Sequence, residues 1–250
     1  MDAPVAGRPP GVGFLGDANA KLPARDKPNM NAAFVVKREV GPRDVTLDKM
    51  PWPRGGDDGF DAAAFRAAVE RYCAEMERLA RAMLPLYAVA LDLPADYFAA
   101  AFEAPLFRLR LSRYAPTPPG EFGINPHVDT SFFTILATSA PGLVVRARGR
   151  GDGGGWVRAP HREGHLVINS GELLAQITND AWPATRHYAI FARSEPAEAE
   201  EEQDRYSLPF FFNATPTYRM AVVPTCCSPD NPPKYPPLSY LEGQGVAQGE

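Results

Sequence analysis

The chain contains few cysteines and few histidines. Among its 250 residues there are only three cysteines, Cys73, Cys226 and Cys227, and four histidines. An odd cysteine count, with two of the three adjacent, argues against a disulfide framework, because neighbouring residues rarely pair with each other. The composition therefore predicts reduced thiols, and we expect a cytoplasmic protein.

The chain also has no long apolar run and no excess of basic charge. No run reaches the roughly 18 apolar residues that a membrane span needs, and the first twenty residues lack the charged-then-apolar pattern of a secretory signal. The formal net charge is −4 and the pI is about 5.7. No basic field favours nucleic acid or an anionic membrane, so we expect the protein to bind neither of them. We also expect a monomer that acts on a small-molecule substrate.

Proline and glycine are abundant, with 27 and 21 residues, so many turns are expected. From residue 104 onward, apolar and polar residues alternate with a period of two, which indicates half-buried strands. The segment "LFRLRLSRY" (106–114) shows this most clearly. One face would hold Phe107, Leu109, Leu111 and Arg113, and the other Arg108, Arg110, Ser112 and Tyr114.

Further strand-like segments follow, separated by turn residues such as "SAPG" (139–142) and "TNDAWP" (178–183). Many short strands with tight connections predict a mainly β protein with a sandwich, barrel or jelly-roll core. The segments are 131–138, 142–149, 156–160, 165–170, 186–193, 206–213 and 218–224.

Two helices are expected before these strands. Apolar residues recur every three or four positions over 61–92, which predicts an amphipathic helix. Asp61 can cap its start, and Pro85 should kink it or end it early. A shorter helix is expected at 94–102. The organisation predicted is a single structural domain with an extended, loop-rich arm (1–58), a helical segment (59–103), a β core (104–224) and a tail (225–250).

The stretch "NPHVDTSFF" (125–133) contains a possible metal site. In a strand, residues i and i+2 point to the same face, so His127 and Asp129 would converge. His187, on another predicted strand, can supply a third ligand. Two histidines and one carboxylate that leave the opposite positions open suit mononuclear non-haem Fe(II). A lone His-x-Asp pair is a weak signal and also occurs by chance.

A second site is indicated by "DRYSLPFF" (204–211). Arg205 and Ser207 share a face, and a guanidinium beside a hydroxyl can bind the carboxylate of an organic acid. The alternative is that Arg205 lies at the rim of the acidic segment 194–204 and pairs with Asp204 or Glu202. His161 and His165 are interpreted as surface residues.

The order of these motifs along the chain resembles that of the isopenicillin N synthase-like branch of the iron(II)/2-oxoglutarate-dependent dioxygenases. The His-x-Asp pair comes first, the distal histidine second and the Arg-x-Ser pair third. "GINPHVDTSFFTILATSAPGLVV" (123–145) is similar to the metal-binding strand of that family and the strands after it. "WVRAPHREGHLVINSGELLAQITNDAWPATRHYAI" (156–190) is similar to the segment leading to the distal histidine. "NMNAAFVVKREV" (29–40) and "NPPKYPPLSYLEG" (231–243) match its flanking segments. The resemblance covers nearly the whole chain.

The resemblance implies a double-stranded β-helix (a jelly-roll, cupin-like core) with flanking α-helices. It implies that His127, Asp129 and His187 bind Fe(II), and that Arg205 and Ser207 bind the distal carboxylate of 2-oxoglutarate. Tyr114 matches a family tyrosine that hydrogen-bonds the same acid. The expected metal ligands are therefore His127, Asp129 and His187, and the expected cosubstrate contacts are Arg205, Ser207 and Tyr114.

The sequence departs from the family pattern at several positions. Ser112 stands where plant members carry asparagine, and Glu172 replaces an aspartate. The acidic segment 194–204 lengthens the hairpin after His187 and is expected to protrude into solvent. Family chains usually begin with a further N-terminal portion, which this chain is expected to lack.

The function implied is that of a dioxygenase that uses Fe(II), 2-oxoglutarate and O2 to hydroxylate, desaturate or cyclise a small organic substrate. Two alternatives remain open. One is an Fe(II) oxidase on the same scaffold, in which Arg205 and Ser207 bind the carboxylate of the substrate itself and 2-oxoglutarate is not used. The other is a truncated binding module that keeps the fold without catalysis.

Overall fold

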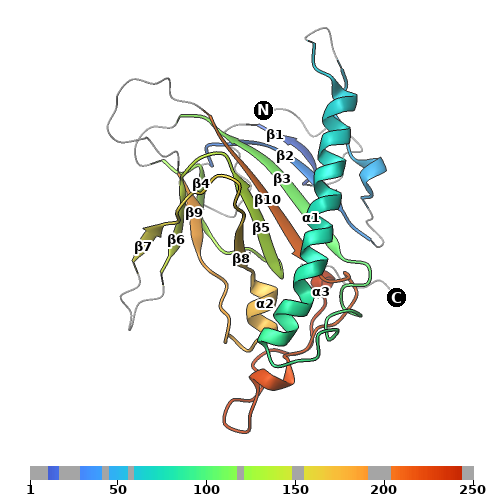
Figure 1. The fold of residues 1–250 in the computed structure, drawn as a ribbon, viewed down its shortest axis with the longest axis vertical. Coiled ribbons are helices and arrows are strands. Elements are labelled where there is room, and N and C mark those ends of the chain that lie inside the picture. The colour runs from blue at the N-terminus through green and yellow to red at the C-terminus, as the bar shows by residue number, and fades with distance from the viewer. Residues whose placement is uncertain are drawn as a thin grey trace.

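The computed structural model describes residues 11–16, 29–40, 45–55, 59–116, 121–147, 155–190 and 204–243. Two antiparallel sheets face each other (Figure 1), and residues of both sheets line one cavity. This arrangement confirms the predicted jelly-roll core. The six-stranded sheet has the order β1 (Gly13–Leu15), β2 (Ala32–Arg38), β3 (Leu106–Tyr114), β10 (Arg205–Asn213), β5 (Phe133–Thr138) and β8 (Val167–Ser170). The four-stranded sheet has the order β4 (Ile124–His127), β9 (His187–Ala189), β6 (Leu143–Arg146) and β7 (Trp156–Arg158).

Strand β10 lies in the middle of the large sheet, between β3 and β5. Its Ser207 is opposite Ser112 of β3 on one side and Thr138 of β5 on the other. The period-two prediction for 106–114 is confirmed. Phe107 and Leu109 are buried in the core, while alternate residues of the same strand line the cavity between the sheets. The cavity-lining alternate residues are Arg108, Arg110, Ser112 and Tyr114.

Helix α1 (Ala62–Ala90) covers the face of the large sheet that is turned away from the small sheet (Figure 1). The carboxylate of Asp61 accepts a hydrogen bond of 2.9 Å from Ala64 N and caps the first turn, as predicted. The helix does not end at Pro85. That proline is exposed, so water can solvate the carbonyl it leaves unpaired, while the neighbouring Leu84 and Ala88 are buried against the core.

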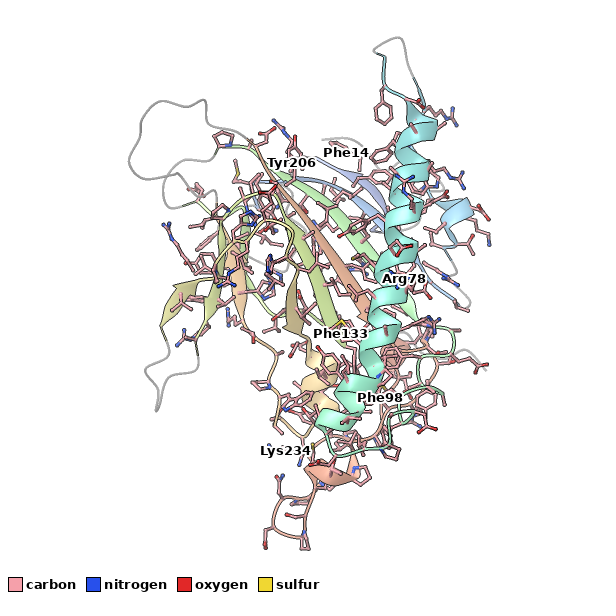
Figure 2. All side chains as sticks on the ribbon, in the orientation of Figure 1. Phe14, Arg78, Phe98, Phe133, Tyr206 and Lys234 are labelled. Atoms are coloured by element: carbon pink, nitrogen blue, oxygen red, sulfur yellow. The ribbon has the colours of Figure 1, made fainter. Side chains whose placement is uncertain are left out.

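Aromatic side chains fill the space between α1 and the large sheet. Tyr87 stacks on Phe133 with ring centroids 5.1 Å apart, and Phe98 packs edge-on against Phe132 at 5.4 Å. Figure 2 shows Phe98 and Phe133 beside the C-terminal half of α1. These contacts hold the helix on the outer face of the sheet and leave the inner face to the cavity.

Two predicted elements are wrong. Residues 94–102 form consecutive turns rather than a helix: Tyr97 N donates to Pro94 O over three residues, and Phe98 and Phe102 turn into the core. Tertiary packing of these rings thus overrides local helix propensity. Residues 218–224 are not a strand, because only Met220 pairs, in an isolated bridge with Leu238.

The segment 1–58 was expected to be a loop-rich arm, but its described part contributes two strands to the large sheet. Phe34 of β2 lies opposite Leu111 of β3 and Phe14 of β1. The described part of this segment therefore contributes to the cavity wall, which Val35 lines.

The remaining elements are short. Residues 194–203, which form most of the acidic segment, lie outside the described residues. Among the residues that the structure describes, no helix is both long enough and apolar enough to cross a membrane. The short elements are the 3-10 helices η1 (Leu47–Lys49) and η2 (Pro224–Cys226) and the helices α2 (Glu172–Ile177) and α3 (Tyr240–Gly243).

Candidate active site

The structure brings His127, Asp129 and His187 together at one end of the small sheet. Their ligand atoms all lie within 4.8 Å of one another. Asp129 Oδ1 is 3.6 Å from His127 Nε2 and 3.7 Å from His187 Nε2. One detail differs from the prediction, because β4 ends at His127 and Asp129 follows it in a loop. The convergence comes from the antiparallel pairing of His127 with His187 and from the turn that places Asp129 between them.

Backbone carbonyls orient both imidazoles. His127 Nδ1 is 2.7 Å from Asn125 O, and His187 Nδ1 is 2.9 Å from Thr185 O. A carbonyl oxygen can only accept, so each Nδ1 donates to its carbonyl and each Nε2 faces the centre, where the neutral form of the ring presents a lone pair. Burial lowers the pKa of His187 and favours its neutral form. Neutral imidazoles with free Nε2 atoms are the form in which histidine binds a metal ion.

The other carboxylate oxygen of Asp129 is held by two side chains. Oδ2 accepts hydrogen bonds from Thr134 Oγ1 at 2.7 Å and from Asn169 Nδ2 at 3.0 Å. Burial disfavours the charged form of Asp129, but hydrogen bonds and the imidazoles around it hold its pKa below the ordinary value. Oδ1 is therefore the oxygen left for a metal ion. Sequence reasoning missed Thr134 and Asn169, which are neighbours on β5 and β8 in a register that no motif reveals.

The backbone of the same loop is fixed by the turn that follows β8. Glu172 N donates a 2.8 Å hydrogen bond to Asp129 O. A Cβ at Gly171 would lie 1.8 Å from Ser131 O, so only glycine permits this close approach. The change to glutamate at 172 is compatible with the contact, because the contact uses the backbone amide.

Arg205 and Ser207 lie on β10 and are both buried at the cavity wall. Arg205 Nε donates to Ala140 O at 3.1 Å, and its guanidinium carbon is 5.1 Å from the centroid of the Tyr114 ring. Within the described residues, the buried Nη1 has no hydrogen-bond partner. Burial lowers the pKa of Arg205. A buried guanidinium with an unsatisfied donor is costly in isolation, and a bound carboxylate would satisfy it.

The alternative partner for Arg205 is engaged elsewhere. Asp204 Oδ2 accepts from Arg113 Nε at 2.6 Å on the outer side of the sheet, and Glu202 lies outside the described residues. Ser112, whose role was open, accepts a hydrogen bond of 3.2 Å from Arg110 Nε. The other two histidines are apart from this cluster, with His165 exposed and His161 Nδ1 3.1 Å from Thr138 Oγ1.

One cavity of about 520 Å³ contains both the triad and the Arg205–Ser207 pair. That volume is within the range of small-molecule sites, about 300–1,000 Å³. The donor set of two imidazole nitrogens and one carboxylate oxygen fits Fe(II), and the unpaired donor of Arg205 fits the distal carboxylate of 2-oxoglutarate.

Comparisons with known proteins agree with this geometry. Residues 105–214 match the model of the 2OG-Fe(II) oxygenase superfamily. A 2-oxoglutarate-Fe(II) type oxidoreductase, hxnY, of Emericella nidulans is 29% identical over 185 residues, which cover 72% of this chain and 50% of the relative. A 2-oxoglutarate-dependent dioxygenase of Gibberella zeae is 31% identical over 182 residues, covering 69% and 47%.

Solved structures show the same fold. The crystal structure of a full-length Neurospora crassa protein in complex with alpha-KG matches with a TM-score of 0.75 at 23% identity, covering 93% of this chain and 72% of that one. The structure of JOX2 in complex with 2OG, Fe and JA matches with a TM-score of 0.71 at 23% identity, covering 96% and 67%. The chain spans about half the length of the curated relatives it matches. Residues 105–214, which hold the metal-binding motif, the distal histidine and the Arg-x-Ser pair, thus match the 2OG-Fe(II) oxygenase superfamily.

Proposed function

We propose that the protein is an Fe(II)- and 2-oxoglutarate-dependent dioxygenase that oxidises a small organic substrate. One observation carries the proposal: a single cavity contains a His-Asp-His cluster and, on the facing sheet, a buried arginine with an unpaired donor. When bound, Fe(II) supplies O2 chemistry, in which 2-oxoglutarate is oxidatively decarboxylated to succinate and CO2 and a C–H bond of the substrate is oxidised.

The residues of the chain bind and orient the reactants. His127 and His187 would present their Nε2 atoms to the metal, because their Nδ1 atoms donate to the carbonyls of Asn125 and Thr185. Asp129 offers Oδ1, since Oδ2 is held by hydrogen bonds. Asp129 would contribute one negative charge and the two imidazoles none, so a bound Fe(II) would keep a net positive charge that favours the keto acid end of 2-oxoglutarate.

The other end of 2-oxoglutarate would be held by β10 and β3. Arg205 offers the free Nη1, and Ser207 offers a hydroxyl on the same face of β10. The Tyr114 ring packs against the guanidinium and restricts its orientation. A planar guanidinium binds a carboxylate through two parallel hydrogen bonds, so this pair would fix the cosubstrate in register with the metal.

The cavity walls favour a small organic substrate. Apolar side chains of both sheets line it, including Leu136 and Val167 on the large sheet and Leu143 and Val145 on the small one. Such walls exclude water from the reacting centre and strengthen the electrostatic contacts within it. Among the structural relatives, the Neurospora crassa protein is described in complex with thymine and JOX2 in complex with JA, both small molecules.

The decisive experiment is anaerobic titration of the metal-free protein with Fe(II) and then 2-oxoglutarate, followed by visible absorption. We expect a charge-transfer band that needs both components and that disappears in His187→Ala. Admission of O2 with a substrate should then release succinate. Iron binding without the band would contradict a role for 2-oxoglutarate and would favour the oxidase. Failure to retain iron would favour a binding module.

A further inference from the structure

Two arginines in the cavity have no role in the function proposed above. Arg108 and Arg110 lie two residues apart on β3, and both line the cavity. Their side chains project from the same inner face as Ser112 and Tyr114, because alternate residues of a strand share a face. Both are only partly exposed.

The contacts of Arg110 hold it without neutralising it. Its Nη2 donates to Asn31 Oδ1 at 2.6 Å and its Nε donates to Ser112 Oγ at 3.2 Å. Both acceptors are uncharged, and no carboxylate among the described residues lies within ion-pair distance. Burial lowers the pKa of Arg110, and the charge of Arg108 acts in the same direction. An arginine remains protonated in proteins, so the position holds a cation whose orientation is fixed by neutral groups.

Among the described residues, the acids that line the cavity are matched to other cations. Lys37 Nζ is 3.3 Å from Glu39 Oε1, and these two charges cancel. If the proposed function holds, Fe(II), Asp129, 2-oxoglutarate and Arg205 carry +2, −1, −2 and +1, which sum to zero. Arg108 and Arg110 are then left with two positive charges. Like charges in a partly buried wall are unfavourable unless an anion compensates them.

The register of the large sheet places Arg108 about one small molecule's length from the metal site. Phe211 of β10 lies opposite Arg108 on one side and opposite Thr134 on the other. Thr134 hydrogen-bonds the metal ligand Asp129. Neighbouring strands are about 4.8 Å apart, so Arg108 and Thr134 are separated by roughly 10 Å across the sheet. Phe211 lies between them and lines the cavity.

We propose that the substrate is an organic acid whose carboxylate binds Arg110 and Arg108, and whose apolar body lies on Phe211 with a C–H bond directed to the metal site. This inference rests on the proposed function and specifies its substrate class. The carboxylate would accept from the guanidinium atoms that Asn31 and Ser112 leave free. It is a different anion from 2-oxoglutarate, whose distal carboxylate is assigned to Arg205 and Ser207, further along the same strands.

The test compares matched ligands on a redox-inert enzyme. Protein loaded with Zn(II) and saturating 2-oxoglutarate is screened by ligand-observed NMR against small carboxylic acids, each paired with its primary carboxamide on the same skeleton. Phenylacetic, cyclohexanecarboxylic and longer aryl acids form the series. We expect acids to be enriched among the ligands that bind, with the best acid binding at least about tenfold tighter than its amide.

The variant Arg108→Met/Arg110→Met should lose this preference while it keeps wild-type affinity for 2-oxoglutarate, measured separately by calorimetry. Arg113→Met, on the same strand but exposed and paired with Asp204, is the matched control and should behave as wild type. Arg108→Met alone, which breaks no hydrogen bond among the described residues, replaces the double variant if that variant fails to fold.

Three results would overturn the inference: no enrichment of acids, a preference that survives in the double variant, or a loss of 2-oxoglutarate affinity in that variant, which would assign the arginines to the cosubstrate. A wild-type protein that binds no 2-oxoglutarate would instead refute the proposed function itself. The calorimetric measurement of 2-oxoglutarate binding therefore distinguishes failure of the proposed function from failure of the proposed substrate class.

Discussion

Replacement of Arg205 by methionine should remove most of the affinity for 2-oxoglutarate and leave metal binding intact. Methionine keeps the length and apolar stem of the side chain but removes the guanidinium. In the structure, that group donates from Nε to Ala140 O, lies against the Tyr114 ring and has an unsatisfied buried Nη1. Removing a weakly compensated buried cation favours folding, whereas removing its hydrogen bond to Ala140 O disfavours it. The two effects offset each other, so the free energy of unfolding of the unliganded protein should change by less than about 1 kcal/mol.

The expected loss of affinity follows from the bonds that the guanidinium can make to a carboxylate. Each charge-assisted bond contributes about 1.5 kcal/mol or more, and a fork-shaped contact has two. Affinity should therefore fall by about tenfold if one bond is lost and by about 150-fold if both are. At a 2-oxoglutarate concentration of about 100 times the wild-type Kd, ligand stabilisation should fall from about 2.7 kcal/mol to about 0.4 kcal/mol for a hundredfold weaker variant.

The assay is calorimetry on Mn(II)-loaded protein, with thermal unfolding as a second measurement. Arg205→Lys should recover only part of the affinity, since an ammonium group cannot reproduce the two-pronged contact. Ser207→Ala should cost less, because it loses one neutral donor. If Arg205→Met binds 2-oxoglutarate as tightly as wild type, the assignment of this pair to the cosubstrate is wrong.

Four further predictions concern the metal site, the thiols and the core. His127→Ala should abolish retention of one iron per chain, measured by metal analysis after gel filtration; full retention would refute the triad. Asn169→Ala should weaken metal affinity by about 10- to 100-fold, because Asp129 loses one of two hydrogen bonds that orient it; unchanged affinity in a competitive titration would contradict this. Burial raises the pKa of Cys73 to about 12, so at pH 8 its thiolate fraction is about 10⁻⁴, and a thiol reagent should modify the partly exposed Cys226 and Cys227 first and Cys73 only on unfolding. Phe133→Ala should lower the free energy of unfolding by about 3–5 kcal/mol, since the ring is fully buried; a denaturant titration that shows less than about 1 kcal/mol would refute the packing described.

Much of the site was predictable because its signals are local. The His-x-Asp pair, the distal histidine and the Arg-x-Ser pair are short motifs, and the structure places all five of their side chains around one cavity. The alternation in 106–114 correctly assigned Tyr114 and Ser112 to the inner face, since strand geometry has a period of two whatever the fold. The helix over 61–92 was predictable for the same reason, from a period near 3.6.

Other features depended on contacts between distant segments. Residues 94–102 carry a helical pattern but form turns, because Phe98 and Phe102 gain more from burial in the core than the backbone would gain from a regular helix. Asn169 supports Asp129 across 40 positions of sequence, and Asn31 holds Arg110 across 79. No periodicity or spacing indicates such pairs.

The sequence by itself determined which residues can bind a metal ion and a carboxylate, and which residues of strands such as 106–114 share a face, because side-chain chemistry and strand periodicity are properties of short segments. Only the tertiary structure decided that Asp129 offers one oxygen, that Arg205 has an unpaired donor, and that Arg108 and Arg110 face the same cavity. These outcomes depend on how strands far apart in the chain align in register. That register is set by the packing of the whole core rather than by any one segment.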